Sequence, residues 1–280
     1  MTHAGLVASA VIVAWLALAG AASVSAKAPA GDETALAKTS QNPVGALVSL
    51  PLQFNLNTGG GLGDETFFNL NFQPVIPVRL PGRYIVIART IVPFISLPAG
   101  AGTRQSGIGD IQEQLFVTPA HPGGIIWGLG PILSFPTATN SAVKTGSWAI
   151  GPTALLLKMS GPWVFGTLMN QLWSFADDGG DPEVNQFLIQ PFANYNFGKG
   201  WALSSSLSMT ANWNAPDGDE WTVPLGMGIS KTTQFNGRPI TVGAQYYHNV
   251  ERPAGSAADQ LRINLTLLYP PRPKPAAKPQ

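Results

Sequence analysis

Apolar and polar residues alternate along most of this 280-residue chain after about residue 45. In WALSSSLSMTANW, residues 201–213, the odd-numbered side chains are almost all apolar, and the even-numbered ones are small or polar. Successive side chains of a strand point to opposite faces, so this segment has an apolar face that ends in an indole at both limits. Two environments suit such a strand: a soluble sandwich between core and water, or a membrane barrel between lipid and lumen.

The same alternation predicts about twelve strands of about ten to fourteen residues each. These are longer than the five or six residues of a typical soluble strand. The segments WTVPLGMGIS and QLRINLTLLY show it most clearly. The predicted strands span 46–57, 65–80, 83–97, 107–118, 123–135, 146–158, 162–175, 184–197, 200–213, 219–230, 238–249 and 259–269.

The connections between the predicted strands are of two kinds. After odd-numbered strands they are long and polar, as in PTATNSAVKT and ADDGGDPE, and after even-numbered strands they are mostly short, as in SGP and GKG. Short turns at one rim, longer loops at the other and an even strand number are typical of outer-membrane barrels. A soluble sandwich has no reason to sort its loops in this way. The sequence therefore favours an all-β fold: a transmembrane, antiparallel, up-and-down β-barrel of about 12 strands.

Aromatic residues near the ends of the predicted strands support the barrel. Such side chains favour the two membrane interfaces, where the ring can be dry while its polar tip stays wet. The alternative is that they are scattered through an ordinary sandwich core. The predicted interface residues are Tyr84, Trp163, Trp201 and Tyr269 near the short turns, and Trp148, Trp173, Trp213, Trp221 and Tyr246 near the long loops.

The predicted inner face carries mainly amides and a few charged groups. A barrel of about twelve strands encloses more space than a packed eight-stranded one, so we expect a wet lumen that suits small, mostly uncharged solutes. The alternative is a closed polar network that only stabilises the barrel. The predicted pore-lining residues are Gln53, Asn55, Asn69, Asn71, Gln73, Arg89, Asp110, Gln112, Gln114, Asn170, Gln186, Gln190, Asn194, Gln245, Arg262 and Asn264.

One position conflicts with this pattern. Glu113 alternates in step with Ile111 and Leu115, which would place a carboxylate on the lipid-facing side. An extra residue in one strand, a β-bulge, reverses the faces of the residues that follow it. We therefore expect that a β-bulge within GIGDIQEQ removes the conflict.

Composition and the chain ends bear on location. Only 11% of residues are charged and the net charge is +1, which argues against a nucleic-acid partner. Cysteine is absent, which excludes disulfides and thiolate metal sites. Residues 1–26 predict a cleaved signal peptide, with an uncleaved membrane anchor as the alternative. We expect a periplasmic linker at 27–41, the barrel at 42–269 and a disordered Pro/Lys-rich tail at 270–280. The tail could contact peptidoglycan.

Catalytic and metal signals are weak. His248 could face outward near the long loops, where barrel lipases keep a serine–histidine pair, but no serine is in obvious register with it. Asp177, Asp178 and Asp181 are weak candidates for a Ca²⁺ or Mg²⁺ site, although such carboxylates are more often simply solvated turns. We expect no enzymatic activity, no cofactor and no metal.

Several segments resemble one protein family. NPVGALVSLPLQFN, FNLNFQPVIPV, RTIVPF, GIGDIQ and NQLWSF are similar to segments of bacterial outer-membrane barrels catalogued as "MetA-pathway of phenol degradation", whose members are often labelled transporters. The resemblance runs from about Asn42 to Tyr269. It implies an outer-membrane barrel and uptake of small hydrophobic or aromatic molecules, and it brings no catalytic or substrate-binding residue.

Together these patterns predict an exported bacterial outer-membrane protein that lets small solutes pass passively or by facilitated diffusion. The expected partners are outer-membrane lipid and lipopolysaccharide, a small-molecule solute, and the barrel assembly machinery during biogenesis. Two alternatives stay open: a closed structural or adhesive barrel that acts through its surface loops, and a barrel-embedded lipid hydrolase.

Overall fold

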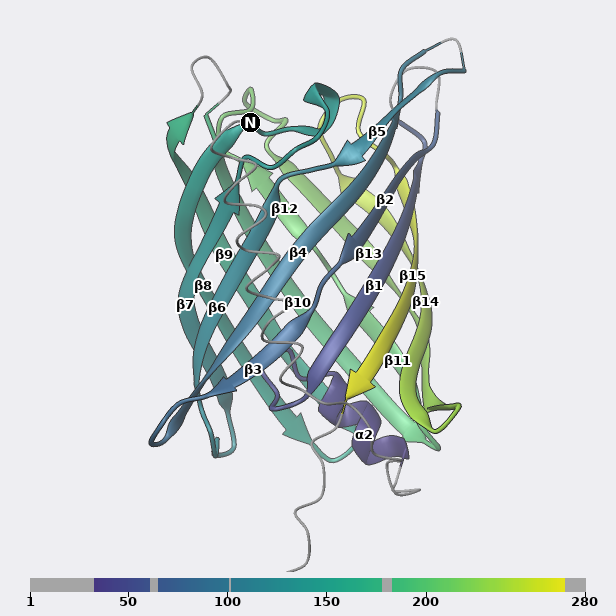
Figure 1. Ribbon diagram of the computed structural model, residues 1–280. Helices are drawn as coiled ribbons and strands as arrows, with labels where there is room; N and C mark the ends of the chain where they lie inside the picture. The colour runs from purple at the N-terminus through teal and green to yellow at the C-terminus, as the bar shows by residue number, and fades with distance from the viewer. Residues whose placement is uncertain (1–32, 61–64, 101, 178–182, 270–280) are drawn as a thin grey trace, which may run out of the picture.

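The computed structural model describes residues 33–60, 65–100, 102–177 and 183–269, without the side chain of Asp177. Within them, fifteen labelled strands form twelve antiparallel strands of the barrel, which we call staves (Figure 1). Three staves are each interrupted and therefore carry two labels. The predicted fold class is confirmed, and each predicted strand overlaps one stave. In chain order the staves are β1 (Val48–Thr58), β2 (Phe67–Phe72) with β3 (Val75–Arg79), β4 (Tyr84–Pro98), β5 (Arg104–Ile108) with β6 (Ile111–Pro119), β7 (Ile126–Phe135), β8 (Ser147–Ser160), β9 (Trp163–Asp177), β10 (Asn185–Gly198), β11 (Trp201–Ser206) with β12 (Met209–Asn212), β13 (Trp221–Phe235), β14 (Arg238–Glu251) and β15 (Asp259–Tyr269).

The first and last strands close the barrel. β1 pairs with β15 along its full length, from Val48 opposite Tyr269 to Thr58 opposite Asp259. Every other stave is hydrogen-bonded to the staves before and after it in the sequence. The sheet therefore has no open edge with unpaired backbone groups, which a strand in contact with lipid could not tolerate.

The three interruptions fall at Gln73–Pro74, Gly109–Asp110 and Leu207–Ser208. Pro74 lacks the N–H that a ladder needs, which explains the first break. At the second, the ladder between β4 and the next stave stops at Phe94 opposite Ile108 and restarts at Ile91 opposite Gln112. Three residues therefore face two, which is a β-bulge.

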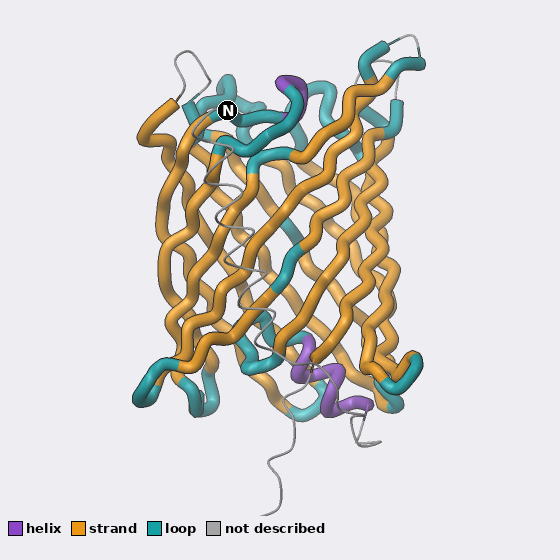
Figure 2. Tube along the Cα trace, viewed as in Figure 1, coloured by secondary structure: helices purple, strands orange, loops and turns teal. Residues whose placement is uncertain are grey.

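The segment 27–41, predicted as a linker, contains a helix in its described part, and this corrects the prediction. α2 (Glu33–Ser40) lies across the short-turn end of the barrel, as Figure 2 shows. Lys231 Nζ donates to Glu33 Oε2 at 3.0 Å, and the Gln41 and Asn196 amides exchange two hydrogen bonds of 3.1 and 3.0 Å. An eight-residue helix is marginal by itself, so these contacts with the barrel hold it. No helix among the described residues is long and apolar enough to cross a membrane.

The predictions for the two chain ends stay predictions. Residues 1–26, expected to be a signal peptide, and 270–280, expected to be a disordered tail, lie outside the described residues. The same holds for the part of the expected linker before Glu33.

Two glycines at the short-turn rim share a backbone conformation but differ in the space around them. Gly200 and Gly237 have nearly the same left-handed φ, +74° and +75°. A Cβ at Gly237 meets nothing within 4 Å, whereas one at Gly200 would lie 2.1 Å from the carbonyl oxygen of Thr232.

We therefore expect Gly237→Ala to cost about 1 kcal/mol of stability for the backbone conformation alone. Gly200→Ala should cost about 1–3 kcal/mol more, because the added methyl group overpacks the hairpin. The measurement is the temperature at which the folded gel band converts to the unfolded one on heating. Equal shifts for the two variants would show that the hairpin at Gly200 is not packed as described.

Candidate functional site: the lumen cavity

A cavity of about 820 Å³ occupies the part of the barrel lumen toward the long loops. It is bounded by inward-facing side chains of β1, β2, β4, β6, β9, β10, β12, β13 and β15, and it reaches loop residues such as Glu65 and Ser256 at the long-loop rim. We call this space the lumen cavity. It is the candidate functional site because it lies on the barrel axis and reaches one mouth.

A chain of side-chain hydrogen bonds runs along one wall of the lumen cavity. Arg89 donates to Gln114 Oε1 at 3.0 Å and to Gln73 Oε1 at 2.5 Å. Gln73 then donates to Gln53 at 3.2 Å, and Gln53 donates to Asn55 at 3.1 Å. Since these residues come from β6, β4, β1 and the Gln73–Pro74 break, the network ties neighbouring staves together across the inner face.

Arg262 continues this network on β15. Its Nε donates to Asn55 Oδ1 at 3.2 Å, its Nη2 to Gln260 Oε1 at 2.9 Å, and its Nη1 to the carbonyl oxygen of Ser206 at 3.1 Å. The guanidinium also lies 4.6 Å from the ring centroid of Tyr247, a cation–π contact. Arg262 is only 4% exposed, so the barrel wall holds it firmly in place.

Asp110 has a second role besides the predicted one of lining the pore. Its carboxylate accepts four hydrogen bonds from the loop 136–146, which joins β7 to β8 and contains the short helix η2 (Ser141–Val143). The donors are the backbone N–H groups of Ala138 (3.0 Å), Thr145 (2.7 Å) and Gly146 (3.0 Å) and the Thr145 hydroxyl (2.5 Å). Asp110 therefore lines the cavity and at the same time clamps a loop at the long-loop end of the barrel.

The β-bulge at Gly109–Asp110 decides which side chains of this stave face the cavity. After the bulge, Asp110, Gln112 and Gln114 line the lumen. Glu113 stays on the outer face, where the Thr90 hydroxyl donates to its Oε2 at 2.6 Å. The bulge is present, but the expectation that it would turn Glu113 inward is wrong. The extra residue lies before Ile111, so Glu113 still alternates in step with Ile111 and Leu115 on the outer face.

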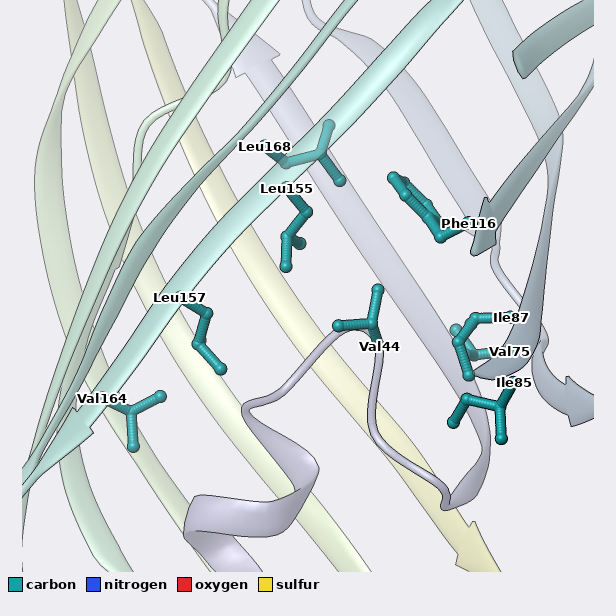
Figure 3. Close-up of a cluster of buried hydrophobic side chains, with 9 residues drawn as sticks. All are labelled: Val44, Val75, Ile85, Ile87, Phe116, Leu155, Leu157, Val164 and Leu168. Atoms are coloured by element: carbon teal, nitrogen blue, oxygen red, sulfur yellow. The ribbon is translucent and has the colours of Figure 1, made fainter. Parts of the chain in front are cut away.

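Apolar side chains cluster on one side of the short-turn half of the lumen, whereas the opposite wall there carries polar residues such as Asn196, Ser204 and Thr232. The apolar side chains belong to β3, β4, β6, β8 and β9 and to Val44 of the segment that follows α2, and they pack together inside the barrel (Figure 3). A Cβ placed on Gly128 would lie 3.2 Å from Val44 Cγ1, so Val44 packs against the barrel wall itself. We call this cluster the apolar plug; it consists of Val44, Val75, Ile85, Ile87, Phe116, Leu155, Leu157, Val164 and Leu168.

Most of the residues predicted to line the pore do line the lumen cavity. Gln245 and Asn264 do not; they bond to each other at 3.1 Å, and Gln245 is buried. Asn194 does not either, and its stave partner Val164 belongs to the apolar plug. Those that bound the cavity are Gln53, Asn55, Asn69, Asn71, Gln73, Arg89, Asp110, Gln112, Gln114, Asn170, Gln186, Gln190 and Arg262.

The prediction missed the apolar residues of the lumen. Leu168, Leu172 and Leu188 bound the cavity from β9 and β10, and Ile91 and Pro93 do so from β4. A signal for them was present, because YIVIARTIVPFI is apolar at odd and even positions alike. Such a run indicates a strand buried on both faces rather than one with a polar side.

The predicted interface aromatics stand near the two rims, and their role at a membrane stays a prediction. At the short-turn end, Trp163 and Tyr195 have ring centroids 4.8 Å apart. At the long-loop end, Trp213 and Trp221 are 5.7 Å apart. Six of the predicted set are exposed, namely Tyr84, Trp163, Trp173, Trp201, Trp213 and Tyr246. Trp148, Trp221 and Tyr269 are partly exposed.

His248 has partners on the outer face. Its Nδ1 lies 2.9 Å from Asp259 Oδ1, and the Tyr246 hydroxyl donates to the same oxygen at 2.5 Å. A hydrolase triad pairs a histidine with a carboxylate in this way and adds a nucleophile, but no serine or cysteine contact with His248 is present among the described residues. The metal candidates Asp178 and Asp181 lie outside the described residues, as does the side chain of Asp177.

Known structures share this architecture. The COG4313 outer membrane channel from Pseudomonas putida F1 is similar with a TM-score of 0.61 at 14% sequence identity, over 80% of this chain and 96% of that one. The NanC porin is similar with a TM-score of 0.51 at 10% identity, over 79% of this chain and 100% of that one. No protein-family model and no curated protein sequence matches the chain. At these identities the likeness shows the fold, an outer-membrane type of barrel.

The Asp110 clamp predicts how the loop 136–146 responds to mutation. Asp110→Asn keeps the size of the side chain but turns an amide donor toward several N–H groups. The loss of charge-assisted hydrogen bonds worth about 1.5–3 kcal/mol should open the loop more often. We expect trypsin to cut after Lys144 about tenfold faster or more, measured by mass spectrometry of the folded protein. Cleavage after Arg83, an exposed residue in a short turn at the other rim, is the internal control, and an unchanged rate at Lys144 would contradict the clamp.

Proposed function

We propose that this protein is a bacterial outer-membrane channel for the passage of small solutes, passive or facilitated. The observation that carries the proposal is the lumen cavity of about 820 Å³ inside a closed barrel, open toward the long loops and lined by amides. Selection would rest on the width of the lumen and the polarity of its lining. No catalytic or energy-coupling arrangement is needed for this activity.

The outer surface supports a membrane location. Large apolar side chains such as Leu129, Met227 and Ile263 are exposed on the outside of the barrel, which costs free energy in water but not in lipid. Aromatic residues near both rims fit the two membrane interfaces. We infer that the short turns face the periplasm and the long loops the outside, with lipid and lipopolysaccharide around the wall and delivery by a cleaved signal peptide and the barrel assembly machinery.

The solute class follows from the mixed lining of the lumen cavity. Amides and two arginines lie beside Ile91, Pro93, Leu168, Leu172 and Leu188. Such a surface accepts small molecules that carry both apolar and hydrogen-bonding groups. Together with the family resemblance, this supports small hydrophobic or aromatic solutes.

In our proposal, the apolar plug and α2 together close the path at the short-turn end in this conformation. Val44 lies between β1 and the rim contacts that α2 and Gln41 make, and it belongs to no strand, so it can leave the lumen without any break in the barrel ladder. Full burial of a valine side chain contributes about 1.5–3 kcal/mol, which is small enough for a reversible movement. In our proposal, the segment that carries α2 and Val44 is the gate.

The decisive experiment replaces Val44 with aspartate and measures conductance in planar lipid bilayers. An unpaired charge among apolar side chains is costly, so the segment should leave the lumen and Val44→Asp should open more often or conduct more than the unmodified protein. Ala46→Asp adds the same charge at an exposed position of the same segment and should behave like the unmodified protein.

The outcomes separate a channel from a closed structural barrel. Unitary current steps that increase in Val44→Asp but not in Ala46→Asp support the gated channel. Folded, membrane-inserted protein that stays silent in all three forms would reject it and leave a structural or adhesive barrel that acts through its loops.

A further inference from the structure

Two guanidinium groups face the lumen cavity without a carboxylate partner. The ion pairs between side chains of the described residues join Lys231 to Glu33 and His248 to Asp259, and neither involves Arg89 or Arg262. The described hydrogen bonds of both arginines go to neutral oxygens of amides and of one backbone carbonyl group, and Arg262 also bonds to the Tyr247 side chain. The cavity wall therefore carries two positive charges that no neighbouring side chain neutralises.

The carboxylates that line the lumen cavity lie elsewhere. Asp110 is saturated by four hydrogen bonds from the loop 136–146. Glu220 accepts the backbone N–H of Gly218 at 2.8 Å in a long loop. Glu65 belongs to the long-loop rim as well. An anion that moves down from the mouth would thus meet the acidic groups first and the arginines deeper in the lumen.

Arg89 is the arginine with free capacity. A guanidinium has five N–H donors, and the two described hydrogen bonds of Arg89 leave its Nε–H and one N–H on each Nη. Its side chain is partly exposed to the lumen cavity, whereas Arg262 is buried. Gln73 and Gln114 hold the Arg89 guanidinium on both sides, so its orientation is set before any solute arrives.

Apolar side chains stand above Arg89 on the same strand. Ile91, Pro93 and Leu97 follow it on the lumen face of β4 and line the cavity. At about 3.4 Å per residue, Ile91 lies about 7 Å and Pro93 about 14 Å further toward the mouth. One strand thus presents a charged donor at its lower end and a strip of hydrocarbon above it.

We propose that the lumen cavity binds small organic carboxylates, with the carboxylate on Arg89 and the apolar body of the solute along Ile91, Pro93 and Leu97. A carboxylate takes two parallel N–H donors from one guanidinium, which gives both affinity and orientation. Buried Arg262 adds positive potential in the same lumen. The assignment rests on the proposed channel function and narrows its solute class from small aromatic or hydrophobic molecules to those that carry a negative charge.

Isothermal titration calorimetry of the folded, detergent-solubilised protein tests the proposal without any need for current. The probes are benzoate and benzamide, which have nearly the same shape but differ in charge, at constant ionic strength. Benzoate should bind at least tenfold more tightly than benzamide. In Arg89→Gln the affinity for benzoate should fall at least tenfold, while the affinity for benzamide stays unchanged.

Arg104→Gln is the matched control, because Arg104 is exposed at the long-loop rim, where it donates to Ser96 Oγ at 2.9 Å. It should leave the affinity for benzoate unchanged. Each variant is first shown to be folded by its heat-dependent shift on a gel. Equal affinities for the two probes, no binding of benzoate, or unchanged benzoate binding in Arg89→Gln would each overturn the carboxylate site. Current steps in bilayers combined with any of these results would leave the channel standing and reject only the solute class.

Discussion

The closed ladder of backbone hydrogen bonds is the constraint from which the other features follow. A strand that faces lipid has no water to satisfy its N–H and C=O groups, so each stave must pair on both sides, and β1 must meet β15. Once the ring is closed, every strand has one face outside and one inside. The outside is mostly apolar, as lipid requires of it in the proposed membrane location. The inside has no such obligation, and this freedom is where the protein places its chemistry.

The inside changes character with depth. The half toward the long loops is lined largely by amides and two arginines that hold one another in fixed orientations, and the half toward the short turns is apolar along β3 to β9. An empty apolar lumen would expose these side chains to water, so a segment that fills it gains hydrophobic stabilisation. Val44 lies inside the barrel and fills part of this space, although it belongs to none of the strands, and α2 anchors its segment at the rim. In the proposed channel, the same contact both completes a core and blocks the path of the solute.

Local irregularities decide the role of individual side chains. The extra residue at Gly109–Asp110 sets the alternation that follows it, with Asp110 on the lumen face and Glu113 on the outer face. Asp110 then meets four donors of a loop that begins 26 residues later in the chain, at residue 136, and becomes part of its support. The outward Glu113 keeps one hydrogen bond, to Thr90, and its Oε1 has no partner among the described residues. Buried carboxylates in one short strand thus serve different purposes.

The amino-acid pattern alone determined the class of fold, the twelve staves and most of the cavity lining, because a strand repeats every two residues and each side chain reports the polarity of its own surroundings. Gln53, Asn55 and Arg89 were recognisable in this way. The tertiary structure alone decided three features: the apolar plug, the hold of Asp110 on the loop 136–146, and the lack of a carboxylate partner for Arg89 and Arg262. Val44 and Asp110 meet partners that are distant in sequence, and α2 is too short to show a period. Contacts of this kind depend on closure of the barrel, and no local periodicity records them.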